Sequence, residues 1–145
     1  MKHPLQPSHV MYAGVHDLLT FESEFVEKFG IQNATAEQLE HSSDPILNWF
    51  KSTGAKHLAI HLDLDVLDAT QFRSLLFAEP NVPKNKYDGV AQGKMSIELV
   101  IKVLNDIAQI ADVVGIGIAE HLPWDALALK DMLTKLPLIG GQAKK

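Results

Sequence analysis

Three carboxylates gather in one short stretch of the sequence, HLDLDVLDA, which spans residues 61–69. Asp63, Asp65 and Asp68 lie within six positions of one another, directly after an apolar segment. Neighbouring carboxylates repel each other and raise each other's pKa unless a cation lies between them. Hard oxygen ligands favour Mg²⁺, Ca²⁺ or Mn²⁺, and added imidazoles shift the preference toward Mn²⁺ or Zn²⁺. The stretch therefore indicates a candidate site for a divalent metal.

The strand predicted before these acids determines which of them share a face. Successive side chains of a strand point to opposite faces, so we expect His61, Asp63 and Asp65 on the same one. In open α/β sheets, ligands bind beyond the carboxyl ends of the strands, where these acids lie. Two other roles stay open, because the acids could instead cap the next turn or pair with surface Lys or Arg. His61 is either an additional ligand or a residue that packs or bonds to the backbone.

A second pair of polar residues closes another apolar run, VVGIGIA, at residues 113–119. Glu120 and His121 follow this run directly. A glutamate at the end of a buried strand needs a partner, because a buried charge is costly unless it is paired. Two neighbouring parallel strands would thus bring acids to the same edge of the sheet. A histidine such as His121, taken alone, is more often a surface or hydrogen-bonded core residue than a ligand.

The elements that must position these residues alternate along the chain. Apolar runs rich in β-branched and small residues predict strands at residues 9–15, 56–62 and 113–119. Helical spacing of apolar residues, with capping residues and glycine stops, predicts helices at residues 21–29, after Thr35, at 46–52, 96–111 and 124–136. This order predicts an α/β fold with parallel strands and right-handed crossovers. Because the strands are continuously apolar, we expect a sheet covered on both faces.

Three features of this plan bear on function or on element boundaries. Three strands make a small sheet, so we expect part of the sheet to be missing from this chain. Residues 77–94 hold two prolines and two glycines and predict a long irregular loop, a type that is usually functional or mobile. Asp44–Pro45 is a suitable N-cap and first helical residue for the helix that Gly54 ends.

Composition restricts the class of protein and its partners. The 145 residues suit one domain over residues 1–145, with residues 140–145 as a flexible tail. A net charge of −5 disfavours nucleic acid or an anionic membrane as a partner. The chain has no cysteine, which excludes disulfides and Cys-ligated zinc. No apolar signal segment and no membrane-spanning run is visible, and a cytoplasmic location fits.

Three motifs together resemble the arginase/agmatinase family, the ureohydrolases. HLDLDVLDA is similar to that family's Asp-x-Asp-x-x-Asp-Pro motif, and VVGIGIAEHLP is similar to the strand that ends in Glu-x-x-Pro. YAGVHD resembles an earlier strand that ends in Ile-Gly-x-Arg-Asp, with Gly14 and Asp17 in place. Order and spacing agree from residue 8 to about residue 136.

The resemblance implies a three-layer α/β/α fold with a mostly parallel sheet, and a binuclear manganese centre. It implies hydrolysis of a C–N bond in a guanidino or amidino compound, with release of urea or a similar product. By the same resemblance, Asp63 and Asp65 are metal ligands, and Asp68 is a second-shell or turn-stabilising residue. Glu120 corresponds to the residue that holds the substrate guanidinium, and the remaining substrate-binding candidates are Glu22 and His121.

The chain also departs from the family pattern. The Gly-Gly-Asp-His and Asp-Ala-His-x-Asp motifs, which carry the family's other ligands, do not occur in it. The resemblance thus covers only the C-terminal half of the family domain, and two of its six metal ligands remain. We therefore expect this chain alone to be inactive and to need a missing N-terminal half. Ala69 replaces the motif's proline and His16 its arginine, while Leu19 replaces an Asp in a way that disfavours L-arginine as the substrate.

Two alternatives from other functional classes stay open. One is a non-catalytic remnant or interaction domain that self-associates into a homo-oligomer through an open sheet edge and an uncovered apolar face. The other is an unrelated α/β domain with a single Mg²⁺ site for phosphoryl transfer. The second is disfavoured because no glycine-rich phosphate loop follows a predicted strand.

Overall fold

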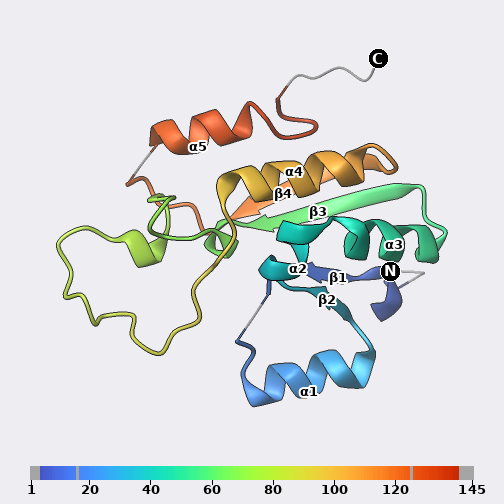
Figure 1. The fold of residues 1–145 in the computed structure, drawn as a ribbon, viewed down its shortest axis with the longest axis horizontal. Coiled ribbons are helices and arrows are strands. Elements are labelled where there is room, and N and C mark those ends of the chain that lie inside the picture. The colour runs from blue at the N-terminus through green and yellow to red at the C-terminus, as the bar shows by residue number, and fades with distance from the viewer. Residues whose placement is uncertain (1–3, 16, 125, 141–145) are drawn as a thin grey trace.

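The structure is a computed structural model that describes residues 4–15, 17–124 and 126–140, except for the side chains of residues 127 and 128. Strands and helices alternate along it as predicted (Figure 1). Three short 3₁₀ helices join them at Pro7–His9, Leu64–Val66 and Leu76–Ala78 (η1, η2 and η3). The strands are β1 Met11–Ala13, β2 Gln32–Ala34, β3 His57–Asp63 and β4 Asp112–Ala119. The helices are α1 Thr20–Phe29, α2 Ala36–His41, α3 Asp44–Thr53, α4 Ile97–Ala108 and α5 Ala126–Leu133. Of the predicted tail, residues 140–145, only Gly140 lies within the described residues.

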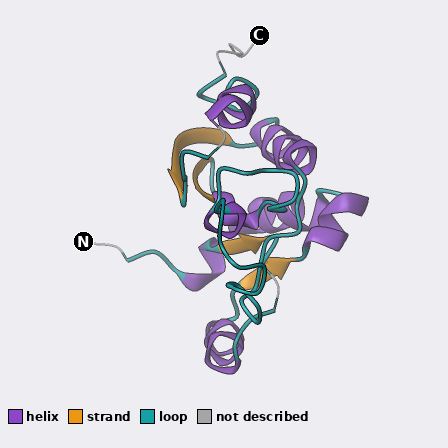
Figure 2. Cartoon of the chain, turned by 90° about the vertical axis from the view of Figure 1, so that its left-hand side faces the viewer, coloured by secondary structure: helices purple, strands orange, loops and turns teal. Residues whose placement is uncertain are grey.

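The strands form two separate parallel pairs (Figures 1 and 2). β1 pairs with β2, and β3 pairs with β4 over a longer stretch that runs from His57 opposite Asp112 to Asp63 opposite Ala119. The α/β class with parallel strands is therefore confirmed, and the sheets are small. The sequence predicts no strand at β2, because its three residues, QNA, include no apolar run that would indicate one.

Helix boundaries follow local capping chemistry. Thr35 caps α2 as predicted, since its side chain accepts a hydrogen bond from the Gln38 backbone N at 3.3 Å. Gly54 ends α3 in the left-handed conformation, with φ of 68°, which glycine adopts without a steric cost. The prediction of Asp44 as the N-cap of α3 is wrong by one position, because the helix already includes Asp44 and the N-cap is Ser43.

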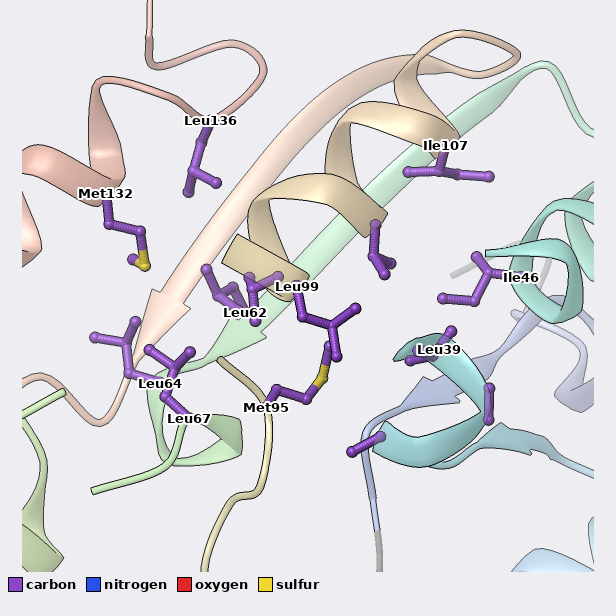
Figure 3. Close-up of a cluster of buried hydrophobic side chains, with 14 of the residues drawn as sticks. Leu39, Ile46, Leu62, Leu64, Leu67, Met95, Leu99, Ile107, Met132 and Leu136 are labelled. Atoms are coloured by element: carbon purple, nitrogen blue, oxygen red, sulfur yellow. The ribbon is translucent and has the colours of Figure 1, made fainter. Parts of the chain in front are cut away.

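The hydrophobic core lies around α4 and the β3–β4 pair (Figure 3). One face of α4 is buried, with Leu99, Val103 and Ile107 each at most 7% exposed. These positions recur at helical spacing, so burial of apolar surface aligns the helix on the strands. Two buried residues of the C-terminal segment, Met132 and Leu136, belong to the same core.

The two faces of β3 differ in burial. Leu62 is buried and belongs to the core, whereas His57, Ala59 and His61 are exposed on the alternate positions. The expectation of a sheet covered on both faces is therefore wrong for β3 in the described part of the chain. An apolar run predicts a strand, but it does not show whether a second layer of structure covers both faces of that strand. In the described part of the chain, no segment buries His57, Ala59 and His61.

The long loop after η3 is held by its own side chains. Glu79 accepts hydrogen bonds from Lys86 Nζ and from the Tyr87 hydroxyl, both at 2.5 Å. The Phe77 and Tyr87 rings meet edge to face, with centroids 5.4 Å apart. The prediction of a long connection without helix or strand is confirmed beyond η3. The loop lies on the side of the carboxyl ends of β3 and β4 (Figure 1).

Among the described residues, no helix has the length and apolar character needed to cross a membrane.

Candidate metal and substrate site

Asp63 and Asp65 lie at the carboxyl end of β3, as the sequence predicts. Asp63 is the last residue of the strand, and the chain then turns into η2, which contains Asp65. The strand alternation expected to place both acids on one face therefore stops at Asp63. The tighter 3₁₀ turn keeps the two carboxylates near each other instead, close enough for Asp63 to raise the pKa of Asp65.

The surroundings of Asp65 disfavour its charged form. Partial burial raises the pKa of the Asp65 carboxyl, and the negative charges of Asp63 and Glu120 add to this effect. The hydrogen bond with Asp63 raises it further. Asp63 Oδ1 is buried and has no hydrogen-bond partner in the described part of the chain. A cation between these oxygens would remove both the repulsion and the unsatisfied acceptor.

Glu120 follows β4, the strand next to β3. Ala119 is paired with Asp63, so Glu120 emerges beside the acidic turn. Its backbone is left-handed, with φ of 57°, a conformation that costs a non-glycine residue about 1–3 kcal/mol. Such strain collects at functional sites. The structure thus places Glu120, after β4, near enough to the acids after β3 for its charge to act on Asp65. His121, the next residue in the sequence, is exposed.

Asp68 stabilises the turn that follows the acids. Its Oδ1 accepts hydrogen bonds from Thr70 N at 2.8 Å and from Thr70 Oγ1 at 2.7 Å. The Thr70 contacts lower the pKa of the Asp68 carboxyl, with a smaller contribution from Gln71. Its backbone N donates to Met95 O at 2.9 Å, which ties the turn to the residue before the Ser96 N-cap of α4. These contacts agree with a turn-stabilising role, which is one of the two roles that the resemblance implies for Asp68.

Glu22 lies apart from the acidic turn. It is in the first turn of α1, where its Oε2 accepts a hydrogen bond from Leu19 N at 2.8 Å. It lines a small cavity of about 390 Å³, whereas Asp63 and Asp65 line a different cavity of about 910 Å³. The structure therefore does not bring Glu22 together with the acids. His16, which replaces the arginine of the family motif, lies outside the described residues.

His61 packs against the neighbouring strand. A Cβ placed on Gly117 of β4 would lie 3.7 Å from His61 Nδ1, so the imidazole lies beside this exposed glycine. The side chain also lines the larger cavity. The contact with Gly117 agrees with the packing role, and the role as an additional ligand stays a prediction.

Gly93 is a positioning residue that the sequence analysis missed. A Cβ at this position would lie 2.1 Å from Asp65 O and 2.2 Å from Val66 C. The long loop therefore presses its backbone directly onto the acidic turn, and only glycine permits this distance. The available signal was a glycine shortly before the Ser96 cap of α4, which is too common a pattern to single out one position.

Comparison with known proteins supports the fold. No family model matches the chain, and no curated protein matches it significantly. Solved structures do match. An arginase from Entamoeba histolytica in complex with L-ornithine superposes with a TM-score of 0.63 at 18% identity, over 85% of this chain and 39% of that one. The chain has a partial arginase-like fold.

Other structures agree with this arginase-like fold. Arginase from Bacillus caldovelox gives a TM-score of 0.59 at 20% identity, over 82% of this chain and 37% of its own. Formimidoylglutamase from Bacillus subtilis gives 0.60 at 18% identity, over 81% and 35%. The chain thus spans less than two fifths of the length of these structures.

The metal implied by the sequence resemblance can be tested against the residues present. The carboxylates of Asp63 and Asp65 suit a hard divalent cation. Asp63 Oδ1 is buried without a hydrogen-bond donor, and a cation would take the place of that donor. Within the described residues, no group of three or more His, Asp or Glu could hold a metal ion. In the described part of the chain, Asp63 and Asp65 are therefore the residues whose chemistry would suit such a cation.

Proposed function

We propose that this chain contributes the acidic part of a ureohydrolase-like active site, which hydrolyses a C–N bond of a guanidino or amidino compound. One observation carries the proposal: Asp63, Asp65 and Glu120 converge at the carboxyl ends of two adjacent parallel strands in a partial arginase-like fold. Ligands bind at this edge in open α/β sheets. The product would be urea or a related amide.

The residues have distinct roles in this proposal. Asp63 and Asp65 bind Mn²⁺ in the completed site, where the metal would lower the pKa of a bound water. Glu120 binds the substrate cation, because a carboxylate pairs with a planar guanidinium through two charge-assisted hydrogen bonds. Asp68 holds the turn, and Glu22 and His121 are further substrate-binding candidates. We also propose a cytoplasmic location.

We further propose that the chain does not turn over substrate alone, since two carboxylates provide too few ligands. The test is urea release in the presence of Mn²⁺ with L-arginine, agmatine and guanidinobutyrate as probes. We expect none above the uncatalysed rate. Turnover at enzyme-like rates by this chain alone would contradict the incomplete site.

The ligand roles have their own test. Calorimetric titration with MnCl₂ should detect binding weaker than micromolar in the wild type and none in Asp65→Asn. Asp88→Asn removes an exposed carboxylate of the long loop and should bind as the wild type does. Unchanged binding by Asp65→Asn would contradict its role as a ligand.

A second candidate is a non-catalytic, self-associating domain, and the surface of α1 favours it. None of the helix's residues is buried, and Phe21, Phe25 and Phe29 lie one turn apart at 66%, 51% and 43% exposure. Figure 2 shows α1 set apart from the remaining elements. An exposed apolar stripe of this kind marks an interaction surface. Light scattering that shows a monomer at every concentration would contradict this candidate.

A further inference from the structure

The short segment that carries Glu120 is fixed on both sides. β4 ends at Ala119, which is still paired with β3. Three residues later, Leu122 N donates a hydrogen bond to Ser74 O at 2.9 Å. Only Glu120 and His121 lie between these two points. Few combinations of φ and ψ let two residues join fixed ends, so the position of the anchors determines the backbone conformation of Glu120.

Trp124 adds a second anchor on the same side. Its indole Nε1 donates to Leu75 O at 2.9 Å, and its backbone N donates to Leu122 O at 2.9 Å. Leu75 O also accepts a bond from Ala78 N at 3.1 Å, and the two lone pairs of a carbonyl allow both. The side chain is 40% exposed, so the indole could donate to water instead. Its bond to Leu75 O is therefore not a consequence of burial alone.

Both acceptors belong to a buried segment that starts at the acidic turn. We call residues 72–75 the strap, and three of its residues, Phe72, Ser74 and Leu75, are 0% exposed. Phe72 N donates to Asp68 O at 2.9 Å, so the strap begins where the turn after the acids ends. Close packing leaves such buried residues little freedom to move. The strap thus gives the acidic turn and the segment after β4 a common, rigid support.

Glu120 has the conformation that an enforced connection would leave. Its φ of 57° is left-handed, and this region is unfavourable for residues other than glycine and, to a lesser degree, asparagine and aspartate. A residue stays in such a conformation only where the surrounding structure holds it there. The paired end of β4 and the two anchors on the strap are the contacts in place to do so.

We propose that Trp124 is a positioning residue for Glu120: its indole N–H, bound to Leu75 O, holds the segment after β4 so that Glu120 stays left-handed near the acidic turn. Trp124 acts only through the backbone and does not contact the substrate. The binding of a guanidinium by the Glu120 carboxylate rests on the proposed function. The conformational role of Trp124 does not, and it can be tested without metal or substrate.

The first test is a double-mutant cycle on the full chain. Glu120→Gly and Glu120→Ala both remove the charge, so the ratio of their unfolding equilibrium constants reports the cost of the left-handed conformation. We expect about a fivefold ratio in the wild-type background, in favour of glycine. Trp124→Phe keeps an aromatic ring but loses the donor. In that background the ratio should fall below about twofold, because the segment can relax to negative φ.

Trp49→Phe is the matched control. The Trp49 indole Nε1 also donates to a backbone carbonyl, Ser8 O, at 3.0 Å, but it lies in α3. This variant should lower stability and leave the fivefold ratio unchanged. If Trp124 only contributed packing, Trp124→Phe would behave in the same way, because it would destabilise both Glu120 variants by the same factor.

The second test observes Glu120 directly, in chains that keep it. The intraresidue NOE between the amide and α protons is strong at positive φ. We expect this NOE of Glu120 to weaken in Trp124→Phe and to be unchanged in Trp49→Phe. The measurement does not require that the Glu120 variants fold.

Three results would overturn the proposal. An unchanged NOE in Trp124→Phe would show that the indole does not hold the conformation, and so would an unchanged ratio in the cycle. An equal effect of Trp49→Phe would show a general loosening of the fold. A failure to bind Mn²⁺ or a guanidinium compound would instead contradict the proposed function and would leave both tests of Trp124 unaffected.

Discussion

At the scale of single residues, Asp65 carries the electrostatic cost of the candidate site. Partial burial and two neighbouring carboxylates act on it in the same direction. Its pKa in the folded state lies above the unfolded value of about 3.8. The folded protein therefore binds a proton more tightly here than the unfolded chain does. This contribution to stability is present below pH 3.8 and is lost as the pH rises through the folded pKa.

Asp65→Asn should remove this pH dependence. Without metal, we expect the variant to be more stable than the wild type at pH 7 by less than about 1 kcal/mol, since solvent screens the partly exposed group. The difference should shrink as the pH falls toward 4. Urea denaturation at several pH values measures it, with Asp88→Asn as the control in the exposed loop. A variant that is less stable than the wild type at pH 7 would contradict the repulsion.

Glu120 adds conformational strain to the same site. Glu120→Gly should stabilise the protein by about 1 kcal/mol relative to Glu120→Ala, because only glycine adopts the φ of 57° without a steric cost. Both variants remove the charge, so their difference isolates the backbone conformation. Chemical denaturation measures it. Equal stability of the two variants would show that the residue is not held in the left-handed conformation.

At the scale of elements, the acidic turn depends on the loop that packs over it. η2 follows β3, and the backbone of Gly93 lies against the backbone of Asp65 and Val66. Asp68 N and Met95 O join the same two segments by a hydrogen bond of 2.9 Å. The geometry of the acids therefore depends on residues about thirty positions later in the chain.

Gly93→Ala should disturb this arrangement. A methyl group there would overlap backbone atoms of the acidic turn, which cannot move as a flexible side chain would, so we expect a loss of about 1–3 kcal/mol in stability. Mn²⁺ binding should weaken in parallel. Gly115→Ala in β4 is the control, because a Cβ there meets no atom within 4 Å and φ is not positive. Comparable losses in both variants would contradict the specific role of Gly93.

At the scale of the whole molecule, two surfaces are left uncovered by the described residues. The larger cavity lies along β1 and β3, and α1 presents an aromatic stripe to solvent. The rings of Phe25 and Phe29 lie 4.7 Å apart on that stripe. Apolar burial drives association, so each surface favours a partner. The two are on different elements and can be tested separately.

Phe25→Lys should separate self-association from folding. Since α1 has no buried residue, we expect the free energy of unfolding to change by less than about 0.5 kcal/mol. If the molecular mass of the wild type in solution rises with concentration, this rise should be smaller for Phe25→Lys. Glu24→Gln changes the net charge by the same amount at another exposed position of the helix and should leave the mass unchanged. Light scattering across a concentration series measures both variants.

The sequence by itself determined the class of the fold and the location of the acids. Apolar runs predicted β3 and β4, and helical periodicity predicted α4, because burial imposes periods that are visible in one dimension. The Asp-x-Asp spacing after one strand and Glu120 after another were sufficient to predict a shared edge. β2 was missed because three mostly polar residues carry no such period.

Only the tertiary structure decided how these parts meet. It showed that a 3₁₀ turn, and not strand alternation, joins Asp63 to Asp65, and that Gly93 packs on that turn. It placed Glu22 in a different cavity from the acids. It also divided the described strands into two separate parallel pairs. These features depend on contacts between residues far apart in the chain, and local propensity and spacing contain no information about such contacts.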